Sequence, residues 1–235
     1  MQKPENITMS QSQKMTSYIQ ESANRKKEYY LFGKTVFIKD DLPENVSLKY
    51  VFDKIEKTVP AFLFYNVDVI YVGDFEIFKK KNVNALYSDG AMYITNNQTD
   101  SDDMVDDIIH ELAHAVEEQY GREIYGDSEI KDEFISKRIW LERNLRHHGY
   151  DTQGHDFTAI EFNEELDKFL FWEVGYAFIN SNFSGKAFIN AYSATSLREY
   201  FAEGFEKYYL GDRNYLSYIC PKLYEKLAEI DSLGD

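Results

Sequence analysis

The sequence predicts an α+β fold, with a small mixed sheet in the first half and helices in the second. Short apolar segments bounded by turn residues occupy the chain up to Asn97, and long amphipathic segments follow it. The apolar fraction of 43% and the aromatic fraction of 16% are typical of a folded chain. We expect one domain over residues 29–235, made of a sheet-containing lobe (about 29–121) and a helical lobe (about 122–235).

The N-terminal residues are rich in Gln, Ser, Lys and Asn. This composition predicts a flexible arm over residues 1–28 that runs into a short helix. Residues 1–16 contain no apolar core segment, so we expect no signal peptide. The most apolar segment, 59–72, is interrupted by proline and polar residues and is too short to span a bilayer.

Short segments of the first half have the β-branched and aromatic composition of strands, and turn residues separate them. They cover residues 36–38, 67–72, 84–87 and 91–95. The sequence Ser88-Asp89-Gly90 predicts a hairpin turn between the last two strands. After the first strand, Ser47 predicts the N-cap of a helix that ends before Pro60.

Segments of the second half place apolar residues at helical spacing. They cover residues 101–120, 129–146, 156–172, 196–210 and a last helix that begins at Pro221. Gly121 and Gly211 are suited to the C-terminal ends of the first and fourth of these helices. Aspartates occupy the first two turns of the first helix, where the helix dipole favours negative charge.

The segment His110-Glu111-Leu112-Ala113-His114 is an HExxH motif in the middle of the 101–120 helix. Residues four apart lie on one face of a helix, so His110 and His114 can bind one metal ion while Glu111 reaches a water molecule beside it. A catalytic zinc ion takes three protein ligands and keeps one position open. The motif therefore predicts a zinc site that needs a third ligand. The alternative is a pair of half-buried histidines on an ordinary amphipathic helix.

Glu199 and Glu203 lie four apart on the 196–210 helix, and each is a candidate third ligand. Ser196 and Glu199 also have the spacing of a capping box, in which the Glu199 carboxylate binds the backbone of Ser196 and leaves Glu203 as the spare ligand. The stripe formed by these glutamates and Glu206 is compatible with a solvated helix face as well. Aromatic residues beside the stripe favour a packed helix.

Residues 191–205 read AYSATSLREYFAEGF, and Tyr192 precedes Glu199 by seven residues. This segment resembles the third-ligand segment of the anthrax lethal factor family of zinc metallopeptidases, a gluzincin family that includes the Pro-Pro endopeptidases. Residues 220–224, which read CPKLY, are similar to the CPxxY segment of the Pro-Pro endopeptidases. The resemblance covers roughly residues 90–225 and depends on these two motifs.

The resemblance implies a zincin-like fold. The small mixed sheet and the HExxH active-site helix would form one wall of a cleft, and the helical C-terminal lobe the other. The residues that it implies are the ligands His110, His114 and Glu199 of one Zn²⁺ per chain, the general base Glu111, the oxyanion donor Tyr192, and Glu203, which orients a ligand histidine. The implied activity is that of a zinc endopeptidase acting on a protein or peptide substrate. Without the resemblance, Tyr192 is one of 19 tyrosines and is expected to pack in the core.

In zincins, a strand at the sheet edge just before the metal-binding helix pairs with the extended substrate. Ala91, Met92 and Tyr93 are the expected substrate-binding residues on that strand, and an interior strand is the alternative. Three further histidines either bind a second metal and line the cleft or lie in a loop near a helix C-terminus, where cationic side chains are favourable. These are His147, His148 and His155.

The net charge of −15 disfavours nucleic-acid binding, because phosphate groups need a basic surface. The single cysteine, Cys220, excludes an internal disulfide, and we expect it to be packed. We expect a monomer without membrane attachment. A weaker resemblance to metallopeptidase-like proteins of tailed phages favours a cytoplasmic or phage-associated chain, with secretion as the alternative. The rival hypothesis is a non-catalytic binding or structural module that retains zinc and the metallopeptidase fold.

Overall fold

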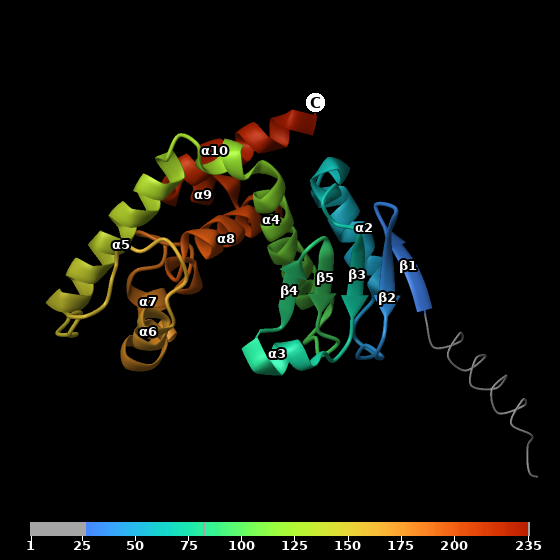
Figure 1. Ribbon diagram of the computed structural model, residues 1–235, viewed down its shortest axis with the longest axis horizontal. Coiled ribbons are helices and arrows are strands. Elements are labelled where there is room, and N and C mark those ends of the chain that lie inside the picture. The colour runs from blue at the N-terminus through green and yellow to red at the C-terminus, as the bar shows by residue number, and fades with distance from the viewer. Residues whose placement is uncertain (1–26, 82, 235) are drawn as a thin grey trace, which may run out of the picture.

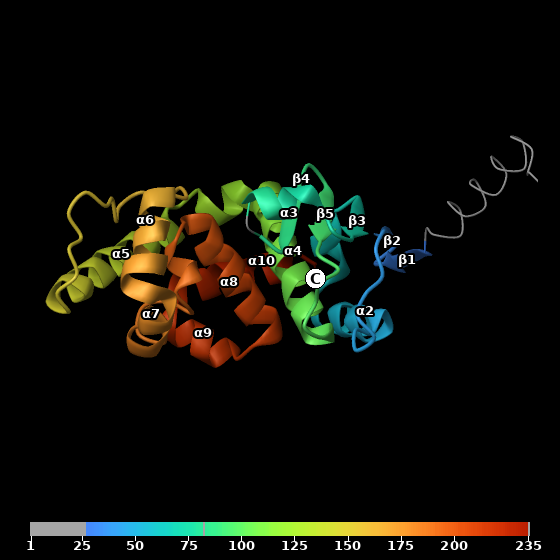
Figure 2. The same cartoon turned by 90° about the horizontal axis from the view of Figure 1, so that it is seen from below.

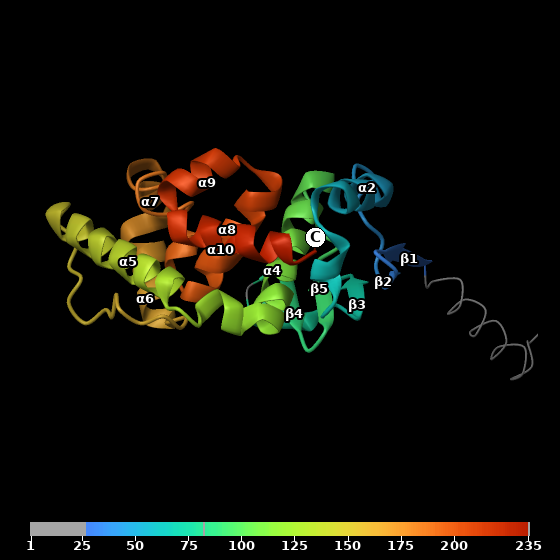
Figure 3. The same ribbon diagram turned by 90° about the horizontal axis from the view of Figure 1, so that it is seen from above.

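A computed structural model describes residues 27–81 and 83–234. These residues form a small five-stranded sheet followed by helices, so the predicted α+β class is confirmed. The sheet lies at one end of the long axis and helices α5 (Glu129–His147) to α10 (Pro221–Asp231) at the other, with α4 (Ser101–Tyr125) between them (Figures 1, 2 and 3). The predicted N-terminal arm lies outside the described residues except for its last two positions.

The sheet is mixed, with the strand order β1-β2-β3-β5-β4. The three central strands are parallel to one another, and each edge strand is antiparallel to its neighbour. The strands are β1 (Lys27–Leu31), β2 (Lys34–Ile38), β3 (Val69–Val72), β4 (Ala85–Ser88) and β5 (Ala91–Ile94). Asp89 and Gly90, with φ of 49° and 79°, form the predicted hairpin turn between β4 and β5.

The two faces of the sheet differ in what covers them. Met92 and Ile94 of β5 are fully buried in the hydrophobic core, and α4 contacts both β4 and β5. On the opposite face, Phe37, Tyr71 and Tyr93 are register neighbours on adjacent strands, with ring centroids 5.6 and 5.5 Å apart. The face against α4 therefore carries the core, and an aromatic ladder lines the other.

Strand β1 was not predicted, and it corrects the arm boundary at residue 28. Lys27 pairs with Ile38 of β2 across a two-residue turn in which Phe32 and Gly33 have φ of 48° and 75°. The predicted N-cap Ser47 is confirmed, because its side chain accepts a hydrogen bond from the Tyr50 N–H. The helices of this half are α2 (Leu48–Thr58), the 3₁₀ turn η1 (Ala61–Phe64) and the unpredicted α3 (Glu76–Lys81).

Helix α4 (Ser101–Tyr125) contains the HExxH segment, as predicted, but it does not end at Gly121. Asp100 caps its first turn by accepting hydrogen bonds from the N–H groups of Asp102 and Asp103. The helix bends at Tyr120, where φ is −112° and ψ is 21°, and then continues to Tyr125. The proposed lobe boundary at residues 121–122 thus falls inside α4, and the division into two lobes stays a prediction.

The predicted helix over residues 156–172 is wrong in its first half. Residues up to Asn163, which caps the next helix, form a loop, and helix begins only with α6 (Glu164–Lys168). Arg138, which is fully buried in α5 (Glu129–His147), explains the loop. Its guanidinium donates hydrogen bonds to the carbonyl oxygens of Asp156 and Ala159 at 3.0 and 2.7 Å, and a helix would need those acceptors for its own N–H groups.

The remaining elements form the helical end of the molecule. Ser196 caps α8 and Gly211 follows its end, as predicted, and Pro221 occupies the first turn of α10. The elements that follow α6 are the π-helical turn η2 (Phe169–Gly175), α7 (Tyr176–Asn182), η3 (Tyr192–Ala194), α8 (Leu197–Leu210), the unpredicted α9 (Arg213–Ile219), α10 (Pro221–Asp231) and η4 (Ser232–Gly234). Among the described residues, no helix combines the length and the apolar character needed to cross a membrane.

Candidate metal centre

The candidate metal centre forms where α8 packs across α4. His110 and His114 lie one turn apart on α4, with ring centroids 5.1 Å apart and nearly perpendicular planes. The Nε2 atom of His110 lies 3.1 Å from one carboxylate oxygen of Glu199, and the Nε2 atom of His114 lies 3.8 Å from the other. The structure therefore brings together the three predicted ligands from two helices.

These distances suit a zinc ion. Ligand atoms at about 2.0–2.1 Å from a tetrahedral zinc lie about 3.3 Å from each other. The 3.1 Å distance to His110 is close to this value, and the 3.8 Å distance to His114 is longer. Two imidazoles and one carboxylate are also a common catalytic donor set for this metal. The residues fit Zn²⁺, and their role as ligands stays a prediction.

The backbone of Glu199 and its side chain have separate partners. Its N–H donates to the Ser196 hydroxyl at 3.1 Å, which is one half of a capping box. The carboxylate that would complete the box faces the two histidines instead. Burial alone would raise the pKa of Glu199, but the hydrogen bond to His110 and the positive charges nearby lower it overall.

Glu111 is buried beside the ligand histidines, with 6% of its surface exposed. Its Oε2 atom accepts a hydrogen bond of 2.5 Å from the backbone N–H of Tyr87 in β4. Burial raises the pKa of the Glu111 carboxyl. His110, Glu111 and His114 form a group whose potential ligand atoms all lie within 4.8 Å of one another, and Glu199 is not a member of any such group among the described residues.

Tyr192 lies beside His110, in η3. Its ring centroid is 6.2 Å from that of His110, and both residues line a cavity of about 330 Å³ together with Glu111. Burial is the main reason that the pKa of the Tyr192 hydroxyl is raised. The structure thus places the predicted oxyanion donor next to the predicted ligands and base.

Two further glutamates of α8 lie near the Nδ1 atom of His110. The Nδ1 atom of His110 is 4.0 Å from Glu203 and 3.9 Å from Glu206. Glu203 is held by Asn190, whose amide donates a 2.5 Å hydrogen bond to it, and burial raises its pKa to about 7. His110, Glu203 and Glu206 form a second group with potential ligand atoms within 4.8 Å of one another. Sequence reasoning gave Glu206 no role at the site and kept a solvated stripe only as the alternative to a packed helix, although its spacing of three from Glu203 puts both on one helix face.

The prediction that residues 91–93 form the sheet edge is wrong. Strand β5 is hydrogen-bonded on both sides, to β3 and to β4, and Met92 is fully buried. The edge strand beside the metal centre is β4, the first strand of the hairpin, and it supplies the N–H that binds Glu111. Ala91, Met92 and Tyr93 therefore have no free edge with which to pair a substrate strand.

The other histidines pack away from the candidate ligands. His148 donates a hydrogen bond from Nδ1 to the Asn144 carbonyl oxygen at 2.8 Å and contacts the rings of Phe178 and Phe183. His155 stacks on Phe169 with ring centroids 4.3 Å apart. Neither these two nor His147 belongs to a group of potential metal ligands within the described part of the chain.

Comparison of the chain with protein-family models, with curated proteins and with solved structures found no match.

Proposed function

We propose that the chain is a zinc endopeptidase of the gluzincin type, with a site similar to that of the anthrax lethal factor family. The observation that supports the proposal most is the Glu199 carboxylate, which lies across the Nε2 atoms of both HExxH histidines. A solvated glutamate would face water and a capping glutamate would face the Ser196 backbone, whereas the Glu199 carboxylate faces two imidazoles of a different helix. The zincin-like fold belongs to the same proposal.

In this proposal, His110, His114 and Glu199 hold the metal. Bound zinc supplies a Lewis acid that lowers the pKa of a water molecule toward about 7. Glu111 takes a proton from the attacking water as the water oxygen bonds to the carbonyl carbon of the scissile peptide. The C–N bond then breaks, and Glu111 returns the proton to the leaving amine. The Tyr192 hydroxyl donates a hydrogen bond to the negative charge that develops on the carbonyl oxygen.

In this proposal, the substrate binds along the outer edge of strand β4. Asn84 accepts a hydrogen bond from the Thr95 N–H, so the alternation of an antiparallel ladder turns the N–H and C=O groups of Ala85 and Tyr87 away from β5. The Tyr87 N–H indeed faces outward, to Glu111. An extended peptide that pairs with Ala85 lies along the row of candidate catalytic groups.

Substitution of the base tests the activity. Wild-type chain loaded with one equivalent of zinc is incubated with a combinatorial peptide library, and products are identified by mass spectrometry. Cleavage by the wild type, together with retained zinc and loss of cleavage in Glu111→Gln, is the expected result. A Glu111→Gln variant that cuts the same bonds at the same rate contradicts the assigned base. Stoichiometric zinc without cleavage of any peptide favours the non-catalytic binding module.

A further inference from the structure

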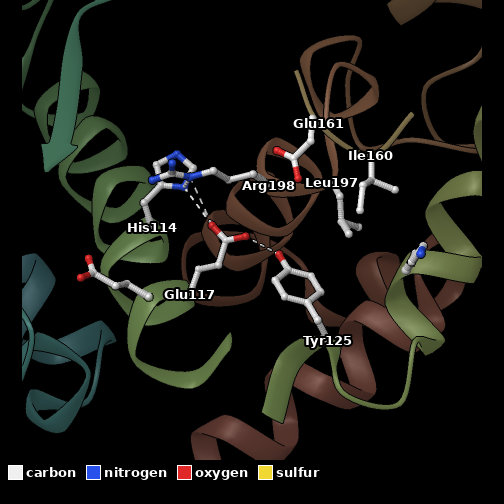
Figure 4. A pocket seen from close by; sticks show the side chains of 9 residues that line it. His114, Glu117, Tyr125, Ile160, Glu161, Leu197 and Arg198 are labelled. Atoms are coloured by element: carbon white, nitrogen blue, oxygen red, sulfur yellow. Dashed lines mark hydrogen bonds and ion pairs between the residues drawn. The ribbon is translucent and has the colours of Figure 1, made fainter. Parts of the chain in front are cut away.

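A cavity of about 560 Å³ opens beside His114 and is distinct from the cavity that Tyr192 lines (Figure 4). Among the polar side chains that line it, Glu117 contacts both Tyr125 and Arg198. Glu117 and Tyr125 belong to α4, and Arg198 immediately precedes Glu199 in α8. The group, here called the Glu117 clamp, therefore connects the two helices that supply the candidate ligands.

Glu117 is the centre of the clamp and is largely buried, with 16% of its side chain exposed. Its Oε1 atom accepts a 2.5 Å hydrogen bond from the Tyr125 hydroxyl. Its Oε2 atom lies 3.3 Å from Nε of Arg198 and 3.6 Å from Nδ1 of His114. The Glu117 carboxylate thus contacts the candidate ligand His114, Arg198 in the helix that carries Glu199, and Tyr125 near the end of its own helix.

The bend in α4 accompanies the Tyr125 contact. Residues eight apart on a straight helix are separated by about 12 Å along its axis, a span that is long for a tyrosine–glutamate pair. The non-helical residue Tyr120 lies between Glu117 and Tyr125. Tyr125 is buried, and burial is the main reason that the pKa of its hydroxyl is raised, so it acts as a donor to Glu117.

Whether Nδ1 of His114 carries a proton determines which neighbouring side chain it can hydrogen-bond. Nε of Arg198 donates to Nδ1 of His114 at 3.0 Å, which requires Nδ1 to carry no proton. A histidine that binds a metal through Nε2 carries its ring proton on Nδ1 and donates it, usually to a carboxylate or carbonyl. Glu117 is the acceptor beside Nδ1. Once Nδ1 carries a proton, the Arg198 N–H can no longer donate to it and donates instead to the Glu117 carboxylate, which it already contacts.

We infer that Glu117 is a positioning residue that accepts the Nδ1 proton of metal-bound His114, and that Tyr125 and Arg198 hold its carboxylate in place. The inference rests on the proposed zinc site. Each ligand histidine then has its own acidic partner, because Glu203 and Glu206 lie behind His110 on the other side. Such partners fix the orientation of the imidazole and raise its affinity for the metal.

Zinc affinity tests the inference without reference to peptide cleavage. The dissociation constant is measured by competition with a chromogenic chelator for the wild type and for Glu117→Gln, which keeps the shape but removes the charge. Glu123→Gln is the matched control, since Glu123 is exposed on the same helix. We expect Glu117→Gln to weaken zinc binding roughly 10- to 100-fold and the control to change it less than about twofold.

Tyr125→Phe is the second variant, because it leaves His114 and Glu117 in place and removes only the hydroxyl that holds the carboxylate. We expect a smaller loss of zinc affinity, and the visible spectrum of the cobalt-substituted protein should shift in both variants but not in the control. Equal zinc affinity in the wild type, Glu117→Gln and Tyr125→Phe overturns the inference and leaves the proposed function intact. A wild type that binds no zinc overturns both.

Discussion

Asp107 lies one turn before His110, where burial makes its negative charge unfavourable. Burial raises its pKa from 3.8 to about 6, and the hydrogen bond from Gln98 lowers it only in part. Because the folded chain holds the proton more tightly than the unfolded chain, the cost of ionisation is present above about pH 6 and disappears as the pH falls toward 4. That cost is at most about 3 kcal/mol.

Asp107→Asn should therefore stabilise the zinc-free protein at pH 7.5 by about 1–2 kcal/mol and by only about a third of that amount at pH 4.5. The neutral amide still accepts the hydrogen bond from Gln98. Urea unfolding at the two pH values measures the difference. Glu123→Gln, which neutralises an exposed charge on the same helix, is the control and should show no such pH dependence. An equal gain at both pH values would contradict the burial argument.

At the scale of the residue, spacing along one helix was enough to predict which side chains face the candidate site. His110 and His114 share a face because they are four apart, whereas Glu199 was preferred to Glu203 only through the resemblance of its segment to the third-ligand segment of a known family. Glu117 and Glu206 could not be selected in this way. Their contacts with the histidines depend on how α8 is rotated against α4, and no local pattern records that rotation.

At the scale of the element, the outward N–H of Ala85 makes β4 testable as the substrate-binding edge. Proline is tolerated on an edge strand where the N–H faces away from the sheet. Ala85→Pro should therefore keep the fold and reduce kcat/KM for an extended peptide by at least about tenfold, because one main-chain hydrogen bond to the substrate is lost.

The matched control is Tyr30→Pro on the opposite edge of the sheet. The ladder between β1 and β2 turns the N–H of Tyr30 outward in the same way, and its side chain is 62% exposed. This variant should cleave peptides at the wild-type rate. Thermal unfolding should give similar midpoints for both variants, and a loss of activity in both to the same degree would show that β4 has no special role.

Two elements show where prediction from sequence ended. The alternating pattern identified both strands of the hairpin, but strand order is a property of the whole sheet, so the interior place of β5 was missed. The amphipathic pattern of residues 156–172 corresponds to helical structure only from residue 164 onward. Arg138, 18 residues upstream of Asp156, binds the carbonyl oxygens that would have begun the helix.

At the scale of the whole molecule, the buried apolar residues of the sheet and of the helices form one connected core. Zinc held between α4 and α8 should stabilise this core as a unit. At a free zinc concentration 100-fold above the dissociation constant, linkage adds about 2.7 kcal/mol to the free energy of unfolding. We expect the midpoint of thermal unfolding to rise by about 5–10 °C, as measured by calorimetry.

Magnesium at the same concentration is the control, because it prefers oxygen ligands and keeps its waters. It should leave the unfolding midpoint unchanged. A midpoint that does not respond to zinc would contradict a site shared by the two helices. The class of the fold was predictable at this scale from composition and from the change of pattern near Asn97, whereas the fifth strand of the sheet, β1, was not.

The distance between the candidate ligands along the chain has a consequence for synthesis. Glu199 follows His110 by 89 residues. At roughly 5–20 residues per second, the ribosome needs roughly 5–18 s to make that stretch, and during this interval the HExxH helix lacks its carboxylate ligand. On the proposed function, the nascent chain is therefore incapable of cutting itself or its neighbours until α8 has emerged and folded.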